Sequence, residues 1–155
     1  MPTLKLGNKA PLFKGPCTGE GLVELSKLKG KKVIIYFYPK DNTPGCTTEG
    51  QNFRDLYNEF KKENTLIYGV SRESIKSHEN FKQKHSFPFD LISDEDEIIC
   101  KKYDVIKEKS MYGRKYMGIE RSTFLIDQEG KLVKAWRKVK VTGHAEEVLG
   151  AVRDL

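Results

Sequence analysis

One of the three cysteines, Cys46, lies where a helix is expected to begin, after an apolar strand pattern and a short polar turn. Thr43 favours the N-cap position and Pro44 the first helical position, which makes Cys46 the third residue of the helix. The backbone N–H groups there have no intrahelical partner and carry the positive end of the helix dipole. A thiol in this place ionises readily and becomes a nucleophile. The alternative is a buried cysteine that only packs against its neighbours.

The motif Pro39-x-x-x-Thr43-x-x-Cys46 belongs to a longer pattern that covers nearly the whole chain. Its segments are residues 36–49, 69–71, 87–89, 91–94, 118–127, 138–141 and 143–144. Together they resemble the peroxiredoxins, and in particular the bacterioferritin-comigratory-protein (Q) subgroup. A match of this length, in the right order, is far more specific than the cysteine motif alone.

The resemblance implies a thiol-dependent peroxidase that reduces hydrogen peroxide and small organic hydroperoxides in antioxidant defence. The thiolate of Cys46 would attack one oxygen of the O–O bond and expel hydroxide or alkoxide, which leaves a sulfenic acid on the sulfur. Thioredoxin or a similar external dithiol would then restore the thiol. No cofactor is expected.

Three neighbours of Cys46 in the sequence could assist this reaction. The Thr43 hydroxyl can accept a hydrogen bond from the thiol or the peroxide while it donates another. Backbone N–H groups around Gly45 can donate toward the peroxide, which makes Gly45 a candidate for substrate binding. Pro39 has no backbone N–H, and it would shape the turn and shield the pocket.

A fixed positive charge beside the sulfur would favour the thiolate. Arg121 is the candidate, because the resemblance includes residues 121–123, although an arginine at a strand start is usually solvated or salt-bridged. Glu49, one turn into the helix, is the second candidate for the substrate site. It could hold Arg121 through a bidentate pair, or it could only stabilise the helix dipole.

The other two cysteines, Cys17 and Cys100, are the remaining candidates for a resolving cysteine. Many members of the subgroup carry one at the position of Gln51 or near that of Lys82, and it is absent from both. A disulfide requires Cα atoms roughly 4.4–6.8 Å apart, and nothing in the spacing places either cysteine that close to Cys46. We expect a flexible setting for Cys17 and simple packing for Cys100. The sequence therefore predicts a one-cysteine mechanism.

Strand and helix patterns alternate along the chain and predict an α/β fold. The expected strands are 33–38, 66–71, 90–92, 122–127 and 131–136, and the expected helices are 46–63, 75–85, 94–103 and 144–153. This order favours a central mixed β-sheet flanked by helices. With the resemblance, it implies one thioredoxin-like domain, residues 1–155, with an N-terminal extension. Ligand sites in such sheets lie at the carboxyl ends of strands, where Cys46 falls.

The composition limits the classes of binding partner and the compartment that we expect. The net charge is +6, but 28 basic residues are interleaved with 22 acidic ones, so no nucleic-acid partner is expected. The apolar runs are too short to cross a membrane, and residues 1–9 lack the apolar core of a signal peptide, which favours the cytoplasm. His78, His85 and His144 have no partners at metal-ligand spacing, so no metal is expected. The chain is expected to be a monomer or a homodimer.

Two other functions remain open from the residues alone. Cys46 could be the sensor of a redox switch, in which the oxidised residue signals to a bound partner without turnover. The chain could also be a non-catalytic α/β interaction domain in which Cys46 is structural. Turnover of peroxide with a reductant separates the peroxidase from both.

Overall fold

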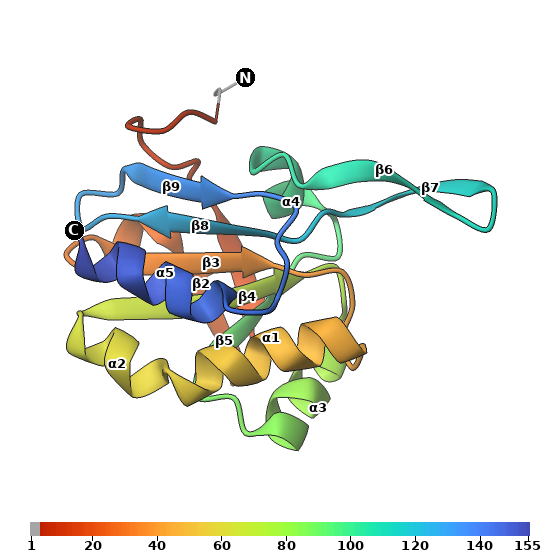
Figure 1. Ribbon diagram of the computed structural model, residues 1–155, viewed down its shortest axis with the longest axis horizontal. Helices are drawn as coiled ribbons and strands as arrows, with labels where there is room; N and C mark the ends of the chain where they lie inside the picture. Colours follow the sequence, from red (N-terminus) through yellow and green to blue (C-terminus); the bar gives the residue numbers. More distant parts are fainter. Residues whose placement is uncertain (1–3) are drawn as a thin grey trace.

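The structure is a computed structural model that describes residues 4–155 (Figure 1). Within these residues, a seven-stranded sheet has the order β2-β1-β5-β4-β3-β8-β9. The strands are β1 (Lys14–Cys17), β2 (Gly21–Glu24), β3 (Lys32–Phe37), β4 (Thr65–Ser71), β5 (Asp90–Ser93), β8 (Ser122–Ile126) and β9 (Leu132–Trp136). Strands β3, β4 and β5 are parallel neighbours, whereas β8 is antiparallel to β3 and β1 is antiparallel to β5. The predicted mixed sheet is confirmed.

Helices cover the sheet unequally on its two faces. The helices are α1 (Pro44–Asp55), α2 (Tyr57–Lys62), α3 (Ile75–His85), α4 (Ile98–Lys102) and α5 (His144–Arg153), with a 3-10 helix η1 at Leu25–Leu28. Helices α1, α2, α3 and α5 lie on one face, which we call the helical face (Figure 1). The N-terminal segment and α4 cover the other, which we call the N-terminal face.

Strand β3 contributes side chains to the hydrophobic cores on both faces of the sheet, because it is buried on both sides. Ile34 and Tyr36 point to the helical face, where they join a cluster that includes Cys46. Ile35 and Phe37 alternate with them and join the cluster on the N-terminal face. An uninterrupted apolar strand of this kind is typical of a central strand covered by other elements on both faces.

Two predicted helices differ from the observed ones. The helix predicted over 46–63 is interrupted at Leu56, whose N–H is shared between the carbonyls of Asn52 and Arg54. The helix predicted over 94–103 is reduced to α4, because Glu97 has a left-handed backbone with φ of +64°. Ile98, the first residue of α4, is 54 % exposed.

The sequence patterns did not reveal two hairpins. The first is β1–β2, which contains Gly15 and Pro16, two residues that are rare in strands. Cys17 ends β1, pairs with Ile92 of β5 and is buried, so the expectation of a flexible setting is wrong.

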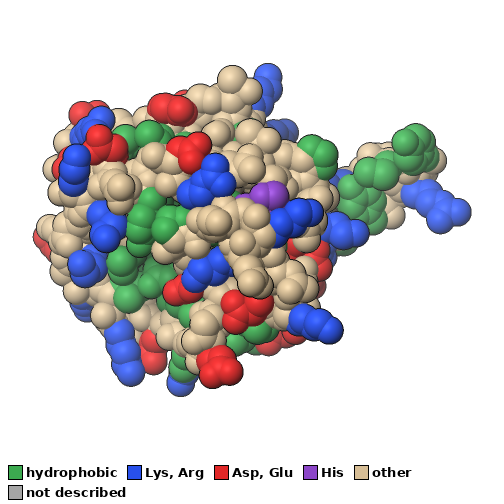
Figure 2. All heavy atoms as spheres, turned by 90° about the horizontal axis from the view of Figure 1, so that it is seen from below, with side chains coloured by type: hydrophobic (Ala, Val, Ile, Leu, Met, Phe, Trp, Pro, Cys, Tyr) green, Lys and Arg blue, Asp and Glu red, His purple; other side chains and the backbone are tan. Residues whose placement is uncertain are grey.

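The second hairpin joins β6 (Ile106–Met111) to β7 (Arg114–Ile119) in a separate two-stranded sheet. It projects from the body as an arm (Figures 1 and 2). The arm exposes large apolar side chains together with basic ones, so its sequence lacks the apolar alternation of a half-buried strand.

Candidate active site

The loop of the candidate site connects β3 to α1 at the carboxyl end of β3. Thr43 is the N-cap, Pro44 is the first residue of α1 and Cys46 is the third, as predicted. The Thr43 hydroxyl donates to the backbone carbonyl of Lys40 at 2.8 Å and makes no capping hydrogen bond to the helix. The first N–H groups of α1 therefore receive no side-chain cap from Thr43.

A chain of three side chains runs from the sulfur to a buried carboxylate. Nη2 of Arg121 donates to Sγ of Cys46 at 3.3 Å, and Nη1 of the same guanidinium donates to Oε1 of Glu49 at 2.6 Å. Cys46 is 2 % exposed, and the Arg121 side chain is 16 % exposed. The guanidinium thus bridges the thiol and the carboxylate in a largely dry setting, where a charge interaction is strong.

The pairing of β3 with β8 places Arg121 beside Cys46. Phe37, the last residue of β3, pairs with Ser122, the first residue of β8, and Arg121 immediately precedes it. Gly45 provides the room, because a Cβ atom at this residue would lie 3.2 Å from Nη2 of Arg121. A larger residue at position 45 would therefore crowd the guanidinium.

Two buried polar side-chain atoms, one on β3 and one on α1, have no hydrogen-bond partner among the described residues. They are the Tyr36 hydroxyl and Oε2 of Glu49. Burial raises the pKa of Glu49 to about 7, although Arg121 opposes the shift. Burial and the nearby Glu49 charge hold the pKa of Tyr36 well above its usual range. Tyr36 is therefore a neutral phenol, while Glu49 titrates near neutral pH.

Pro39 is the second residue of the β3–α1 connection. Its carbonyl accepts a hydrogen bond from the Ser71 hydroxyl at 3.3 Å, which fixes the loop to the end of β4. Pro39 also lines an open depression of about 360 Å³ together with Arg72, which is paired with Glu97 at 2.8 Å. Of the predicted site residues, Pro39 and Thr43 thus lie in the β3–α1 connection, and Arg121 lies directly before β8. The others, Gly45, Cys46 and Glu49, lie on α1.

Cys17 and Cys100 lie in a different environment from Cys46. Both belong to the core cluster of the N-terminal face, whereas Cys46 belongs to that of the helical face. Burial, followed by the charge of Asp90, raises the pKa of the Cys17 thiol. Burial together with the Asp94 carboxylate raises the pKa of the Cys100 thiol well above its usual range. Both environments disfavour the thiolate.

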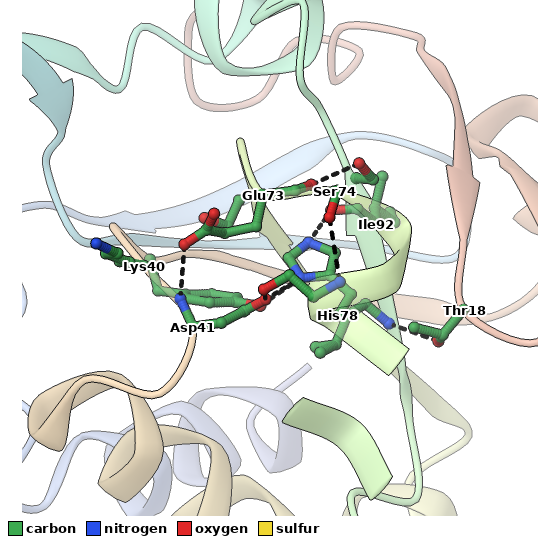
Figure 3. Close-up of polar contacts among 12 residues, drawn as sticks. Thr18, Lys40, Asp41, Glu73, Ser74, His78 and Ile92 are labelled. Atoms are coloured by element: carbon green, nitrogen blue, oxygen red, sulfur yellow. Dashed lines mark hydrogen bonds and ion pairs between the residues drawn. The ribbon is translucent and has the colours of Figure 1, made fainter. Parts of the chain in front are cut away.

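A buried polar cluster next to the site, at Asp41 and His78, was not predicted from the sequence. Nδ1 of His78 lies 2.7 Å from Oδ2 of Asp41, and both side chains are inaccessible to solvent (Figure 3). The two residues are 37 positions apart. The available signal was weak: a single aspartate in the turn between Pro39 and Thr43.

Neither a metal site nor a membrane span is found in the part of the chain that the structure describes. Residues 4–155 contain no group of three or more His, Cys, Asp or Glu side chains placed to hold a metal ion. None of their helices is long and apolar enough to cross a bilayer.

Comparison with known proteins identifies the family. The model of the AhpC/TSA family matches residues 6–135. The chain belongs to the AhpC/TSA family. Peroxiredoxin Bcp of Xanthomonas campestris is 60 % identical over 124 residues, which cover 80 % of this chain and 78 % of that protein.

Solved structures agree with this assignment. A cysteine-to-serine mutant of PrxQ from Xylella fastidiosa has a TM-score of 0.93 at 45 % identity, covering 99 % of this chain and 98 % of that one. The Xanthomonas campestris bacterioferritin comigratory protein, studied for its alkyl peroxide reduction activity, has a TM-score of 0.88 at 53 % identity and covers 92 % and 90 %.

This member of the AhpC/TSA family is a peroxiredoxin, and therefore a thiol peroxidase. The resemblance read from the sequence is confirmed, and so is the thioredoxin-like fold. The alternative of a non-catalytic interaction domain is wrong.

Proposed function

We propose that Cys46 is the peroxidatic cysteine and that it reduces hydrogen peroxide and small organic hydroperoxides. The observation that carries this proposal is the 3.3 Å contact between its Sγ and Nη2 of Arg121, at the third residue of α1. A guanidinium remains charged at all physiological pH values, so it favours the thiolate over the thiol.

The reaction has two steps. First, the Cys46 thiolate forms an S–O bond with the peroxide, the O–O bond breaks, and the departing hydroxide or alkoxide takes a proton from solvent. The sulfur loses two electrons to the peroxide and becomes a sulfenic acid. Second, an external dithiol supplies two electrons and two protons, the sulfenic oxygen leaves as water, and the reductant becomes a disulfide.

Four residues assist the first step in this proposal. Arg121 stabilises both the thiolate and the negative charge that develops on the departing oxygen. Glu49 holds the guanidinium through the 2.6 Å contact, and the Gly45 backbone lets it approach. The Thr43 hydroxyl, which already donates to Lys40, is free to accept a hydrogen bond from the substrate.

Pro39 has a supporting place in the proposal. It offers no backbone donor that would compete for the peroxide, and its carbonyl is tied to Ser71. The proline therefore shapes the entrance of the site from the β4 side. Organic hydroperoxides are included as substrates because the related Xanthomonas campestris protein was studied for alkyl peroxide reduction.

A one-cysteine cycle is supported by the placement of the other thiols. Cys17 and Cys100 lie in the core of the N-terminal face, with the central sheet between that core and the one that contains Cys46. Thioredoxin or another external thiol would therefore reduce the sulfenic acid directly. We assign the activity to antioxidant defence in the cytoplasm, where a reducing environment keeps thiols free.

Two measurements test the proposal. Peroxide consumption is followed with thioredoxin, its reductase and NADPH, and steady turnover is expected. Non-reducing peptide mapping after one equivalent of peroxide is expected to show Cys46 as a sulfenic acid. A dominant disulfide between Cys46 and Cys17 or Cys100 would overturn the one-cysteine cycle. Stoichiometric oxidation without turnover would favour the redox sensor.

A further inference from the structure

The loop that leads to Cys46 is anchored by a buried carboxylate. Oδ1 of Asp41 accepts a hydrogen bond from the Tyr38 hydroxyl at 2.7 Å, and Oδ2 accepts one from the Ser77 hydroxyl at 2.7 Å. The third partner is Nδ1 of His78, also at 2.7 Å (Figure 3). These contacts join Asp41 to Tyr38, which directly follows β3, and to α3 at the same carboxylate.

Both ring nitrogens of His78 lie within hydrogen-bond distance of oxygen atoms. Its Nδ1 faces Asp41, and its Nε2 lies 3.0 Å from the backbone carbonyl oxygen of Ile92. A carbonyl oxygen can only accept, and the carboxylate already accepts from two hydroxyls. Both ring nitrogens therefore face oxygen atoms, and with an ionised Asp41 the ring donates from both of them and forms a buried ion pair with that carboxylate.

A buried ion pair is expensive to desolvate and is often no more stabilising than apolar residues of the same volume. Stability alone is therefore a weak reason for the Asp41–His78 pair. Its place in the chain points to the site, because Asp41 lies midway between Pro39 and Thr43.

We propose that the Asp41–His78 ion pair is a positioning device for Cys46, an inference that rests on the peroxidatic role proposed above. The pair holds the loop against α3 and β5 and so keeps the first turn of α1 wound, with the Cys46 sulfur beside Arg121. Neither residue touches the sulfur or Arg121 among the hydrogen bonds of the described residues.

The coupling from Asp41 to Cys46 passes through a short, fixed backbone. The Asp41 N–H donates to Oε1 of Glu73 at 3.3 Å, so the backbone of this residue is held as well as its side chain. Only Asn42, with a left-handed φ of +62°, separates Asp41 from the N-cap Thr43. The direction in which the chain enters α1 therefore depends on where Asp41 is anchored.

The decisive experiment compares two reactions of Cys46 in the full chain, in Asp41→Asn and in His78→Gln. Oxidation by hydrogen peroxide is measured by stopped flow, and alkylation by iodoacetamide is measured by mass. We expect peroxide oxidation to slow by about tenfold to a hundredfold, since misplacement of a reacting group by an ångström has effects of this size. Alkylation is expected to become faster, because release of the first turn exposes a sulfur that is now buried.

The control is Lys82→Gln. Lys82 also lies on α3 and pairs with Asp90 of β5 at 2.6 Å, but it does not contact the loop. This variant is expected to react at the rates of the unaltered protein in both assays. A general loosening of α3 would change Lys82→Gln in the same way as the loop variants and would overturn the proposal.

Two measurements decide the question if the buried variants do not fold. Ser77→Ala removes one donor to Asp41 at a partly exposed position, and a smaller change in the same opposite directions is expected. Nitrogen-15 NMR of His78 in the unaltered protein should show a proton on both ring nitrogens at pH 7.

A neutral His78 ring would overturn the positioning role. So would Asp41→Asn and His78→Gln variants that do not combine slower peroxide oxidation with faster alkylation. Failure of the peroxidatic assignment itself looks different, because Cys46 would then resist peroxide in the unaltered protein.

Discussion

Cys46 and Cys100 are both buried free thiols, yet the two faces of the sheet give them opposite electrostatic surroundings. Cys46 on the helical face receives a hydrogen bond from the Arg121 guanidinium. Cys100 on the N-terminal face lies beside the Asp94 carboxylate, which also accepts from its backbone N–H at 2.7 Å. The neighbouring carboxylate and burial both raise the pKa of the Cys100 thiol. Exposure therefore does not separate Cys46, the proposed nucleophile, from Cys100, whereas the sign of the neighbouring charge does.

The two carboxylates on the two faces differ in the same way. Asp94 is satisfied by the N–H groups of Ile99 and Cys100, so it serves to hold the start of α4. Glu49 uses one oxygen to hold Arg121, and its second oxygen has no partner among the described residues. One carboxylate thus stabilises local structure, and the other supports a charge next to the proposed nucleophile.

Removing each sulfur in turn tests this contrast most strongly. Cys46→Ser is expected to abolish peroxidase activity, because a hydroxyl at this position is not ionised near neutral pH. Cys17→Ser and Cys100→Ser are expected to retain the first oxidation step at close to the original rate. Stopped-flow oxidation and coupled NADPH consumption measure both. Substantial activity in Cys46→Ser would refute the assignment.

Removing the positive charge should have the next largest effect. A hydrogen bond to a charged group contributes about 1.5–3 kcal/mol, so Arg121→Gln should slow peroxide oxidation by about tenfold to a hundredfold. Alkylation of Cys46 should slow as well, because less thiolate is present. This distinguishes the charge effect from the loop variants, in which alkylation becomes faster.

Arg72→Gln is the matched control for Arg121. Arg72 is a second partly buried arginine near the loop, but it pairs with Glu97 and not with Cys46. Its loss should leave both rates nearly unchanged. Equal effects of the two arginine variants would mean that general positive potential, and not the direct contact, activates the sulfur.

A smaller expected effect is the dependence of the free energy of unfolding on pH that Glu49 causes on the helical face. Glu49 has a pKa raised from 4.5 to about 7 by burial, so the folded protein retains this proton more strongly than the unfolded chain does. Its contribution to the free energy of unfolding is present below pH 4.5 and is lost as pH rises to about 7. Urea unfolding at pH 5 and pH 7 should show this loss. The Glu49→Gln variant should lose less free energy of unfolding between pH 5 and pH 7. The same loss in the variant would contradict the assignment of this pH dependence to Glu49.

The smallest expected effect is a loss of stability as pH falls, opposite in direction to the effect of Glu49. Burial lowers the pKa of His144 from 6.5 to about 4, and its Nε2 lies 2.8 Å from Oγ1 of Thr123. The unfolded chain therefore binds this proton first, and stability is lost as pH falls from 6.5 to about 4. Comparing Glu49→Gln with Glu49→Gln/His144→Asn by urea unfolding isolates the effect. If the double variant keeps the acid slope, His144 is not its source.

Local signals in the sequence predicted the start of α1 and both ends of α3 and α5. Thr43 and Pro44 specify a helix start by their own backbone preferences, and Ser74 caps α3 by accepting from the N–H of Ser77. The family resemblance, together with these signals, pointed to Cys46 and Arg121. The contact between these two residues was a hypothesis, because nothing in the neighbourhood of Arg121 along the chain specifies its partner.

The tertiary structure alone decided the remaining features. The pairing of β3 with β8 brings Arg121 to Cys46 across 75 positions, and the fold brings His78 to Asp41 across 37. The β1–β2 hairpin buries Cys17 despite the glycine and proline beside it. Helix caps depend on adjacent residues and can be read locally. Contacts between distant strands depend on sheet order and on which face is covered, and these are fixed only when the whole chain packs.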